Sequence, residues 1–101
     1  MNTIFYGVVA EEKERNLERQ EVYIKEIKSL PRGFLVTRKR GAKKYYYLQY
    51  RVSADVVTKY IGNDQIDIEE IKKGIAKRKH YEGLIRKLKI EYKQMCKIVK
   101  E

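Results

Sequence analysis

Apolar positions at the start of the chain recur at helical spacing. Residues 8–29 contain no glycine or proline and many Glu, Lys and Arg side chains. The positions that share one helix face, at intervals of three, four and three, are Leu17, Gln20, Ile24 and Ile27. Pro31 ends the predicted helix, because the residue before a proline avoids helical backbone angles and proline cannot continue the hydrogen-bond ladder. The first half has a poor apolar face, so we expect fraying before about Glu14.

A different pattern runs from Gly33 to Gly62. Three runs of β-branched and aromatic residues, each of the length of one strand, cover residues 34–37, 45–50 and 56–61. The segments between them, residues 39–43 and 52–55, are short enough for hairpin connections. Three strands joined by two such turns form an antiparallel meander, which Asn63 and Asp64 close.

The last segment predicts a longer helix over residues 66–99. Asp64 or Asp67 can cap its first turn, because their carboxylates accept hydrogen bonds from free backbone N–H groups. Glu69 and Glu70 follow in the first turn, where the helix dipole favours negative charge.

The apolar residues of this helix fit one heptad frame that is interrupted in the middle. They are Ile68, Ile71, Ile75, Ile85, Leu88, Tyr92, Met95 and Val99. Arg78 and Glu82 occupy the frame between the two halves. Gly74 and Gly83 each weaken the helix by roughly 1 kcal/mol relative to alanine. We therefore expect a bend, or a change of packing partner, near residues 76–83.

The order helix, three strands, helix predicts a single α+β domain over residues 1–101, with the sheet covered on one face. We expect the two helices to pair antiparallel, or the second helix to form a dimeric coiled coil with a copy of itself. The heptad tail from Ile85 to Val99 favours a homodimer, because so short a chain offers it little else to pack on. A bare, solvated helix is the alternative.

The charge of the chain is +10 and is unevenly distributed. Residues 1–30 carry a net charge of −1, residues 31–65 a net charge of +6 and residues 66–101 a net charge of +5. A balance this basic favours a polyanionic partner, with nucleic acid first, an acidic protein surface second and an anionic membrane third. Charge that serves only solubility is the alternative.

The sequence lacks the residues that several classes of function require. No apolar run approaches the length of a membrane span, and residues 1–10 are too short and too uncharged for a secretory signal. The only cysteine, Cys96, is expected to be a packed helix residue, which fits a reducing cytoplasm. The only histidine, His80, lies in a lysine-rich helix without ligand spacing, so we expect no metal and no cofactor. No phosphate loop or catalytic motif occurs, and we expect a protein that is not an enzyme.

The chemistry of the chain concentrates in the predicted meander. Side chains of a strand point alternately to its two faces. One face of the middle strand carries Tyr46, Leu48 and Tyr50. The other carries Tyr45, Tyr47, Gln49 and Arg51. Because this second face ends in polar side chains, we expect it to point outward, beside a hairpin tip that holds five cationic residues.

Cations, tyrosines and an amide on one sheet are a combination typical of nucleic-acid binding. Lys and Arg neutralise phosphates, tyrosine rings stack on bases at roughly 1–3 kcal/mol each, and Gln and Arg can read base edges. The candidate binding residues are Arg38, Lys39, Arg40, Lys43, Lys44, Tyr45, Tyr47, Gln49, Arg51 and Lys59. The alternative is that the tyrosines are only good strand formers at a half-buried edge.

The same segment resembles an uncharacterised bacterial, archaeal and phage family with the pattern LP-G-L…R…YYYLQYR…V…KYIG before a charged helix. The residues that carry the resemblance are Leu30 to Gly33, Leu35, Arg38, Tyr45 to Arg51, and Lys59 to Gly62. The chain departs from the pattern at residues 52–55. The pattern leads us to expect a turn that contains glycine there, but these four residues include none. The family is similar in layout to the arm-binding domains of tyrosine recombinases, which bind DNA through a three-stranded sheet. It implies no function of its own.

These observations favour a nucleic-acid-binding accessory protein, of a phage or mobile element, with DNA preferred to RNA. The alternative is a phage-encoded inhibitor or adaptor, for example an anti-CRISPR protein, that binds a nucleic-acid enzyme or its guide complex. The charge of +10 argues against an inhibitor that mimics nucleic acid, but not against one that docks on an acidic surface. A structural coiled-coil dimer is a third hypothesis.

Overall fold

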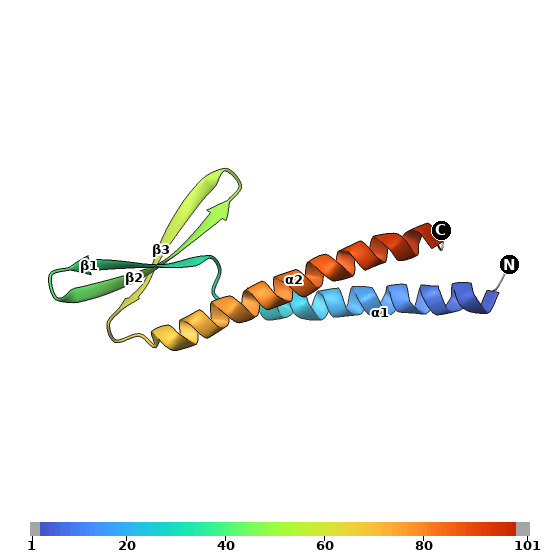
Figure 1. Ribbon diagram of the computed structural model, residues 1–101, viewed down its shortest axis with the longest axis horizontal. Coiled ribbons are helices and arrows are strands. Elements are labelled where there is room, and N and C mark those ends of the chain that lie inside the picture. Colours follow the sequence, from blue (N-terminus) through green and yellow to red (C-terminus); the bar gives the residue numbers. More distant parts are fainter. Residues whose placement is uncertain (1–2, 99–101) are drawn as a thin grey trace. The chain divides into compact units, whose positions relative to one another are not determined.

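The computed structural model describes residues 3–98 (Figure 1). Its elements are α1 (Thr3–Lys28), β1 (Phe34–Arg40), β2 (Lys43–Val52), β3 (Asp55–Asn63) and α2 (Ile68–Ile98). The strands form one antiparallel sheet in the order β1-β2-β3. The α+β class and the order helix, meander, helix are therefore confirmed. The predicted helix end at Val99 lies outside the described residues.

The chain divides into two compact units. The helix unit combines α1 with the part of α2 that begins at His80, and the sheet unit comprises residues 30–79. A single domain over the whole chain stays a prediction. In the helix unit, the contacts of Asn16 with Leu88 and of Tyr23 with Tyr81 run in opposite directions along the two helices, so the pair is antiparallel.

The predicted apolar face of α1 is wrong in part. The helix begins at Thr3, earlier than predicted, and runs without interruption to Lys28, while the expected fraying before Glu14 stays a prediction. Gln20 and Ile27 do turn inward, but Leu17 and Ile24 are exposed. The inward stripe, which we call the seam, repeats at intervals of three and four and consists of Tyr6, Val9, Lys13, Asn16, Gln20, Tyr23 and Ile27. Its buried middle is polar, which a search for apolar residues does not find.

Helix α2 is continuous, and its packing partner changes along its length. Asp67 caps it, because the backbone N–H of Glu70 donates to its Oδ1 at 3.2 Å. The boundary between the two units falls after Lys79, inside the range predicted for a change of partner. Gly74 has a packing role, since a Cβ there would lie 2.7 Å from the Cδ of Pro31.

Two-residue turns connect the three strands. Gly41 takes a φ of 63° in the first turn. Ser53 takes a φ of 54° in the second, a left-handed angle that glycine adopts more readily. The turn without glycine therefore forms with a serine in a strained position. Past Tyr47 the register of β2 and β3 shifts, so Tyr46 pairs with Gly62.

The interior is small in both units. Among the described residues, the buried apolar side chains are Val9, Ile85 and Leu88 in the helix unit and Leu48 in the sheet unit. Ile85 and Leu88 belong to the predicted heptad frame of α2, and they pack within the chain's own helix pair. Most of the surface of each unit is therefore left for solvent or for partners.

Candidate nucleic-acid interface

One face of the sheet gathers most of the predicted binding residues. Residues that pair directly across an antiparallel ladder point to the same side of the sheet. The side that we call the tyrosine face carries Phe34, Val36, Arg38 and Arg40 of β1, Lys43, Tyr45, Tyr47, Gln49 and Arg51 of β2, and Val56, Thr58 and Tyr60 of β3. The opposite side, the leucine face, is centred on the buried Leu48. The predicted split of β2 into an inner and an outer set follows this alternation.

Aromatic rings form a connected group on the tyrosine face. The ring of Tyr60 lies 5.4 Å from that of Tyr47 and 6.4 Å from that of Tyr45, centroid to centroid. The guanidinium carbon of Arg38 lies 4.9 Å from the centroid of the Tyr47 ring. Tyr60 is 52% exposed, and Tyr45 and Tyr47 are half-buried. The group therefore offers one open ring and one cation that is already stacked on an aromatic surface.

Tyr60 is a residue of this face that the sequence analysis missed. The signal was present: if residues 53 and 54 form a two-residue turn, counting back along both strands pairs Tyr60 with Tyr47. The irregular register lies beyond this pair and changes only the neighbours of Tyr45 and Tyr46.

The predicted cations divide between the two faces. Those on the tyrosine face are Arg38, Arg40, Lys43 and Arg51. The other three, Lys39, Lys44 and Lys59, lie on the leucine face. The structure therefore does not bring Lys59 together with the tyrosine cluster, because Lys59 pairs with Leu48.

The hairpin tip between β1 and β2 places like charges directly opposite each other. Arg40 pairs directly with Lys43, and Lys39 pairs with Lys44. Like charges directly opposite each other destabilise a ladder. None of these four side chains forms an ion pair within residues 3–98. A bound anion would relieve this repulsion.

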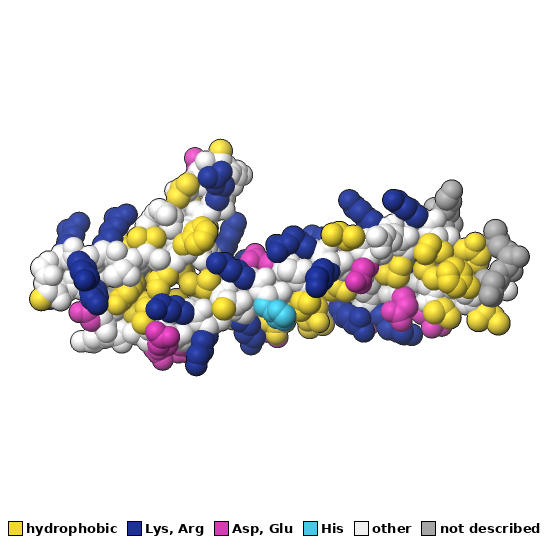
Figure 2. Space-filling view, viewed as in Figure 1, with side chains coloured by type: hydrophobic (Ala, Val, Ile, Leu, Met, Phe, Trp, Pro, Cys, Tyr) yellow, Lys and Arg dark blue, Asp and Glu magenta, His cyan; other side chains and the backbone are white. Residues whose placement is uncertain are grey.

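Carboxylates are scarce on the sheet. The only one within the three strands is Asp55, which pairs with Val52 on the leucine face. The tyrosine face therefore presents its cations without a neutralising acid in the strands. In the view of Figure 2, Lys and Arg side chains project from the sheet unit in several directions.

Two polar groups complete the face. The Gln49 side-chain amide donates to the Thr58 hydroxyl at 3.4 Å, which leaves its carbonyl oxygen and a second N–H available. Arg51 is exposed, and its backbone carbonyl accepts a 2.7 Å hydrogen bond from Arg32. Arg32 also lies 5.0 Å from the ring of Tyr50, so it ties the chain before β1 to β2.

A small polar cavity of about 220 Å³ lies where β2 and the end of β3 meet. Its lining residues are Lys43, Tyr45, Asn63, Asp64 and Gln65. Asp64 Oδ1 accepts from the Lys44 backbone N–H, and Asn63 Oδ1 accepts from the Gln65 backbone N–H, both at 3.0 Å. These bonds hold the acid and the amide in the turn.

Two kinds of feature are absent from the part of the chain that the structure describes. Residues 3–98 contain no group of three or more His, Cys, Asp or Glu side chains placed to hold a metal ion. Within the same range, neither helix combines the length and the apolar character that crossing a membrane requires. His80 is exposed, and its ring lies 5.9 Å from that of Tyr81.

Comparison with known protein families gives a match over much of the chain. The model of one protein family, described as a domain of unknown function (DUF6788), matches residues 10–73. The match includes most of α1, the whole meander and the first residues of α2. Neither the curated proteins nor the solved structures contain a match to the chain. The likeness to recombinase arm domains therefore stays a prediction.

Proposed function

The chain belongs to the DUF6788 family, and we propose that it is a non-enzymatic nucleic-acid-binding protein that works through the tyrosine face. The observation that carries the proposal is the coincidence, on one open face, of the Tyr45–Tyr47–Tyr60 ring cluster with four cations and no strand carboxylate. The meander resemblance leads us to place it in a phage or mobile element. A cytoplasmic location follows from such a partner.

The cations would hold the phosphate backbone. Arg40 and Lys43 repel each other in the free protein, so an approaching phosphate gains their attraction and removes that cost. Arg38 and Arg51 extend the positive potential along the strands to both sides of the ring cluster. Binding of this kind releases counterions and weakens steeply as salt increases.

The rings would hold bases. Tyr60, which is half exposed, can stack on an unpaired base, while Tyr45 and Tyr47 support it from the middle strand. Gln49 and Arg51 can then donate to base edges. Stacking predicts a preference for single-stranded DNA, whereas a sheet that enters the major groove predicts a preference for duplex DNA.

The test is fluorescence anisotropy with labelled duplex DNA, single-stranded DNA and RNA at several salt concentrations. If all four cations of the tyrosine face contact phosphates, log K against log salt has a slope of about −3.6 for duplex and about −2.8 for a single strand. The preferred ligand distinguishes stacking from groove binding. Absence of binding at low salt would refute the proposal.

Matched variants locate the surface. Lys43→Ala and Lys59→Ala remove the same charge from opposite faces. We expect Lys43→Ala to reduce the slope by about 0.7 to 0.9 and Lys59→Ala to leave it nearly unchanged. Tyr60→Ala should weaken binding by roughly 1–3 kcal/mol, whereas Tyr60→Phe, which keeps the ring, should bind as the parent does. Equal effects of the two lysine variants would rule out this face.

A protein partner is the second candidate, and a specific observation favours it. Phe34 and Val56 lie on the tyrosine face with exposed fractions of 67% and 57%. Exposed apolar side chains beside cations also fit an inhibitor or adaptor that docks on the acidic surface of a nucleic-acid enzyme, as an anti-CRISPR protein would. Phe34→Ser and Val56→Ser would then abolish recovery of one protein in a nuclease-treated pull-down, while nucleic-acid affinity stays low throughout.

A further inference from the structure

A second stripe with heptad spacing flanks the seam of α1, one residue before it in the sequence and therefore about 100° around the helix. Besides the seam, intervals of three and four connect Phe5, Val8, Glu12, Arg15, Arg19, Val22 and Glu26. We call this set the outer stripe. Phe5, Val8 and Val22 are 49%, 53% and 56% exposed, so three large apolar side chains lie on it in contact with solvent. A helix with apolar residues at heptad spacing on two sides is typical of a bundle with more than two helices.

We propose that α1 pairs through its outer stripe with α1 of a second copy, in an antiparallel and two-fold symmetric arrangement. Antiparallel heptad stripes bring the first position of one helix opposite the fourth position of the other. On the outer stripe this rule places Phe5 opposite Val22 of the second copy. It places Glu12 opposite Arg15 and Arg19 opposite Val8, and the symmetry repeats each layer.

These layers are chemically complementary. Phe5 and Val22 bury apolar surface at both ends of the interface. Glu12 and Arg15 attract each other in the centre, where symmetry doubles the pair. The Arg19 stem can cover Val8 while its guanidinium stays in water. The outer stripe is thus complementary to a second copy of itself, as a two-fold interface requires.

The arginine at the centre can serve both helices. Within one chain, Arg15 already pairs with Glu12 and, through Nη2, with Glu11 at 3.4 Å. Its side chain is 54% exposed, so solvent still reaches the guanidinium. Five N–H donors allow it to keep these contacts and to reach Glu12 of the second copy.

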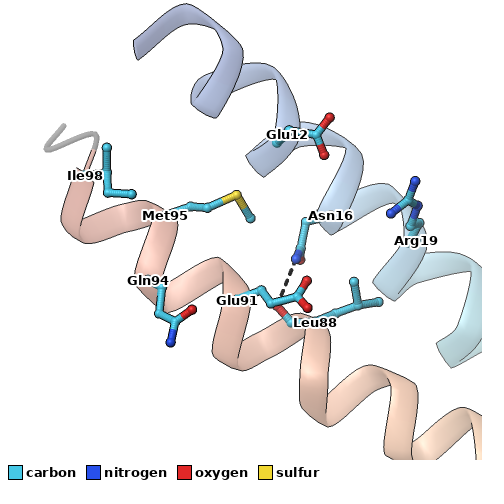
Figure 3. Close-up of a pocket in the computed structure, with 8 residues that line it drawn as sticks. All are labelled: Glu12, Asn16, Arg19, Leu88, Glu91, Gln94, Met95 and Ile98. Atoms are coloured by element: carbon cyan, nitrogen blue, oxygen red, sulfur yellow. Dashed lines mark hydrogen bonds between the residues drawn. The ribbon is translucent and has the colours of Figure 1, made fainter. Parts of the chain in front are cut away.

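A cavity in the helix unit lies at the height of the proposed contact. It measures about 300 Å³ and is lined by Glu12, Asn16, Arg19, Leu88, Glu91, Gln94, Met95 and Ile98 (Figure 3). Glu12 and Arg19 belong to the outer stripe, so the cavity opens beside it. In the proposed register, residues 8–15 of the second copy lie opposite residues 12–19. Val8 and Arg15 of that copy are therefore placed to fill the cavity.

The electrostatics of α1 favour a second copy over a polyanion. Residues 1–30 carry a net charge of −1 in a chain of +10. Two such helices can approach without the repulsion that the rest of the chain would impose. The stripe of Ile85 and Leu88, which the sequence analysis assigned to a dimer, is occupied by the chain's own helix pair.

The experiment is a charge exchange followed by light scattering on size-exclusion chromatography. The parent chain should elute as a dimer, at twice the 12.1 kDa of one chain. Glu12→Arg places like charges opposite each other in its own dimer, and so does Arg15→Glu. Each variant alone should therefore weaken self-association at least tenfold. An equimolar mixture pairs opposite charges in both central layers and should restore the dimer.

A matched pair of substitutions tests the face itself. Val8→Glu lies on the outer stripe and should give a monomer, whereas Leu17→Glu, on an exposed position outside the stripe, should leave the dimer intact. A parent chain that is monomeric at all concentrations would overturn the proposal. So would a dimer that Val8→Glu does not weaken, or two charge variants whose mixture does not associate. Misfolding cannot produce the recovery in the mixture.

Discussion

The helix unit and the sheet unit distribute polar and apolar groups in opposite ways. The helix unit buries Lys13, Asn16 and Gln20 in its seam and leaves apolar residues such as Val22 on its outside. The sheet unit buries Leu48 and exposes rings and cations. Neither unit is therefore held together by a large apolar interior, and each exposes a different kind of surface to solvent.

We expect the polar seam to set the register of the helix unit more than its stability. The Asn16 side-chain amide donates to the Leu88 carbonyl at 2.9 Å, and Gln20 donates to Asn16 Oδ1 at 2.6 Å. Lys13 Nζ lies 5.6 Å from the centroid of the Tyr92 ring. A buried amide that must meet one particular carbonyl selects one alignment of two helices, at a cost in stability.

The largest effect should come from breaking that network on one side. Asn16→Ala leaves the buried Gln20 amide without its acceptor and should lower the free energy of unfolding by about 1–3 kcal/mol. Replacing both residues, as Asn16→Leu with Gln20→Leu, should instead raise it, because no unsatisfied group remains. Urea unfolding followed by circular dichroism measures both. A double variant with a lower free energy of unfolding than the single variant would mean that the network itself stabilises the helix pair.

The next effect separates the two units along the same helix. Gly74→Ala places a Cβ 2.7 Å from Cδ of Pro31 and should destabilise the sheet unit by about 1–2 kcal/mol after the gain in helix propensity. Gly83→Ala meets only the end of Arg86 at 3.8 Å and should stabilise the protein by about 1 kcal/mol. Thermal unfolding of both variants gives the comparison. Stabilisation by both substitutions would show that Pro31 yields.

The smallest effect should appear in the second hairpin. Ser53→Gly relieves a left-handed backbone angle and should stabilise the sheet unit by about 0.5–1 kcal/mol, since the flexibility of glycine in the unfolded chain offsets part of the gain. Ala54→Gly has no such strain to relieve and should destabilise by a similar amount. Hydrogen exchange of the β2 and β3 amides checks whether the change is local.

The sequence predicts the elements of this fold well because particular residue types mark where the elements begin and end. Pro31 ends α1, Asp67 caps α2, and the alternation in β2 separates Tyr47 from Leu48. These signals are local, so they do not depend on the rest of the structure. The confirmed α+β order rests on them.

The seam of α1 could not be found from hydrophobicity, because tertiary contacts decide it. Leu17 is more apolar than Asn16, yet Asn16 is buried, since its amide finds the Leu88 carbonyl. A long Lys13 stem is likewise buried beside an aromatic ring on the other helix. The useful signal was the regular three-four-three recurrence of Tyr6, Val9, Lys13 and Asn16, which indicates a face without regard to polarity.

The candidate site was predictable in its middle strand and less so in its neighbours. Tyr45, Tyr47, Gln49 and Arg51 follow from alternation alone. The face of Lys59 and the contribution of Tyr60 depend on the register of β3, which the exact length of the turn at Ser53 determines. Once that turn is known, both assignments follow by counting.

The helix unit is assembled from the two ends of the chain, and this has a consequence for how the protein folds. The hydrogen bond between Asn16 and Leu88 joins residues 72 positions apart, whereas the meander pairs near neighbours. Closing a long loop costs more chain entropy than closing a short one. We therefore expect the meander to form first and to shorten the effective loop between the helices, which then zip together. In pulse-labelled hydrogen exchange, protection should appear in β2 before it appears at Leu88.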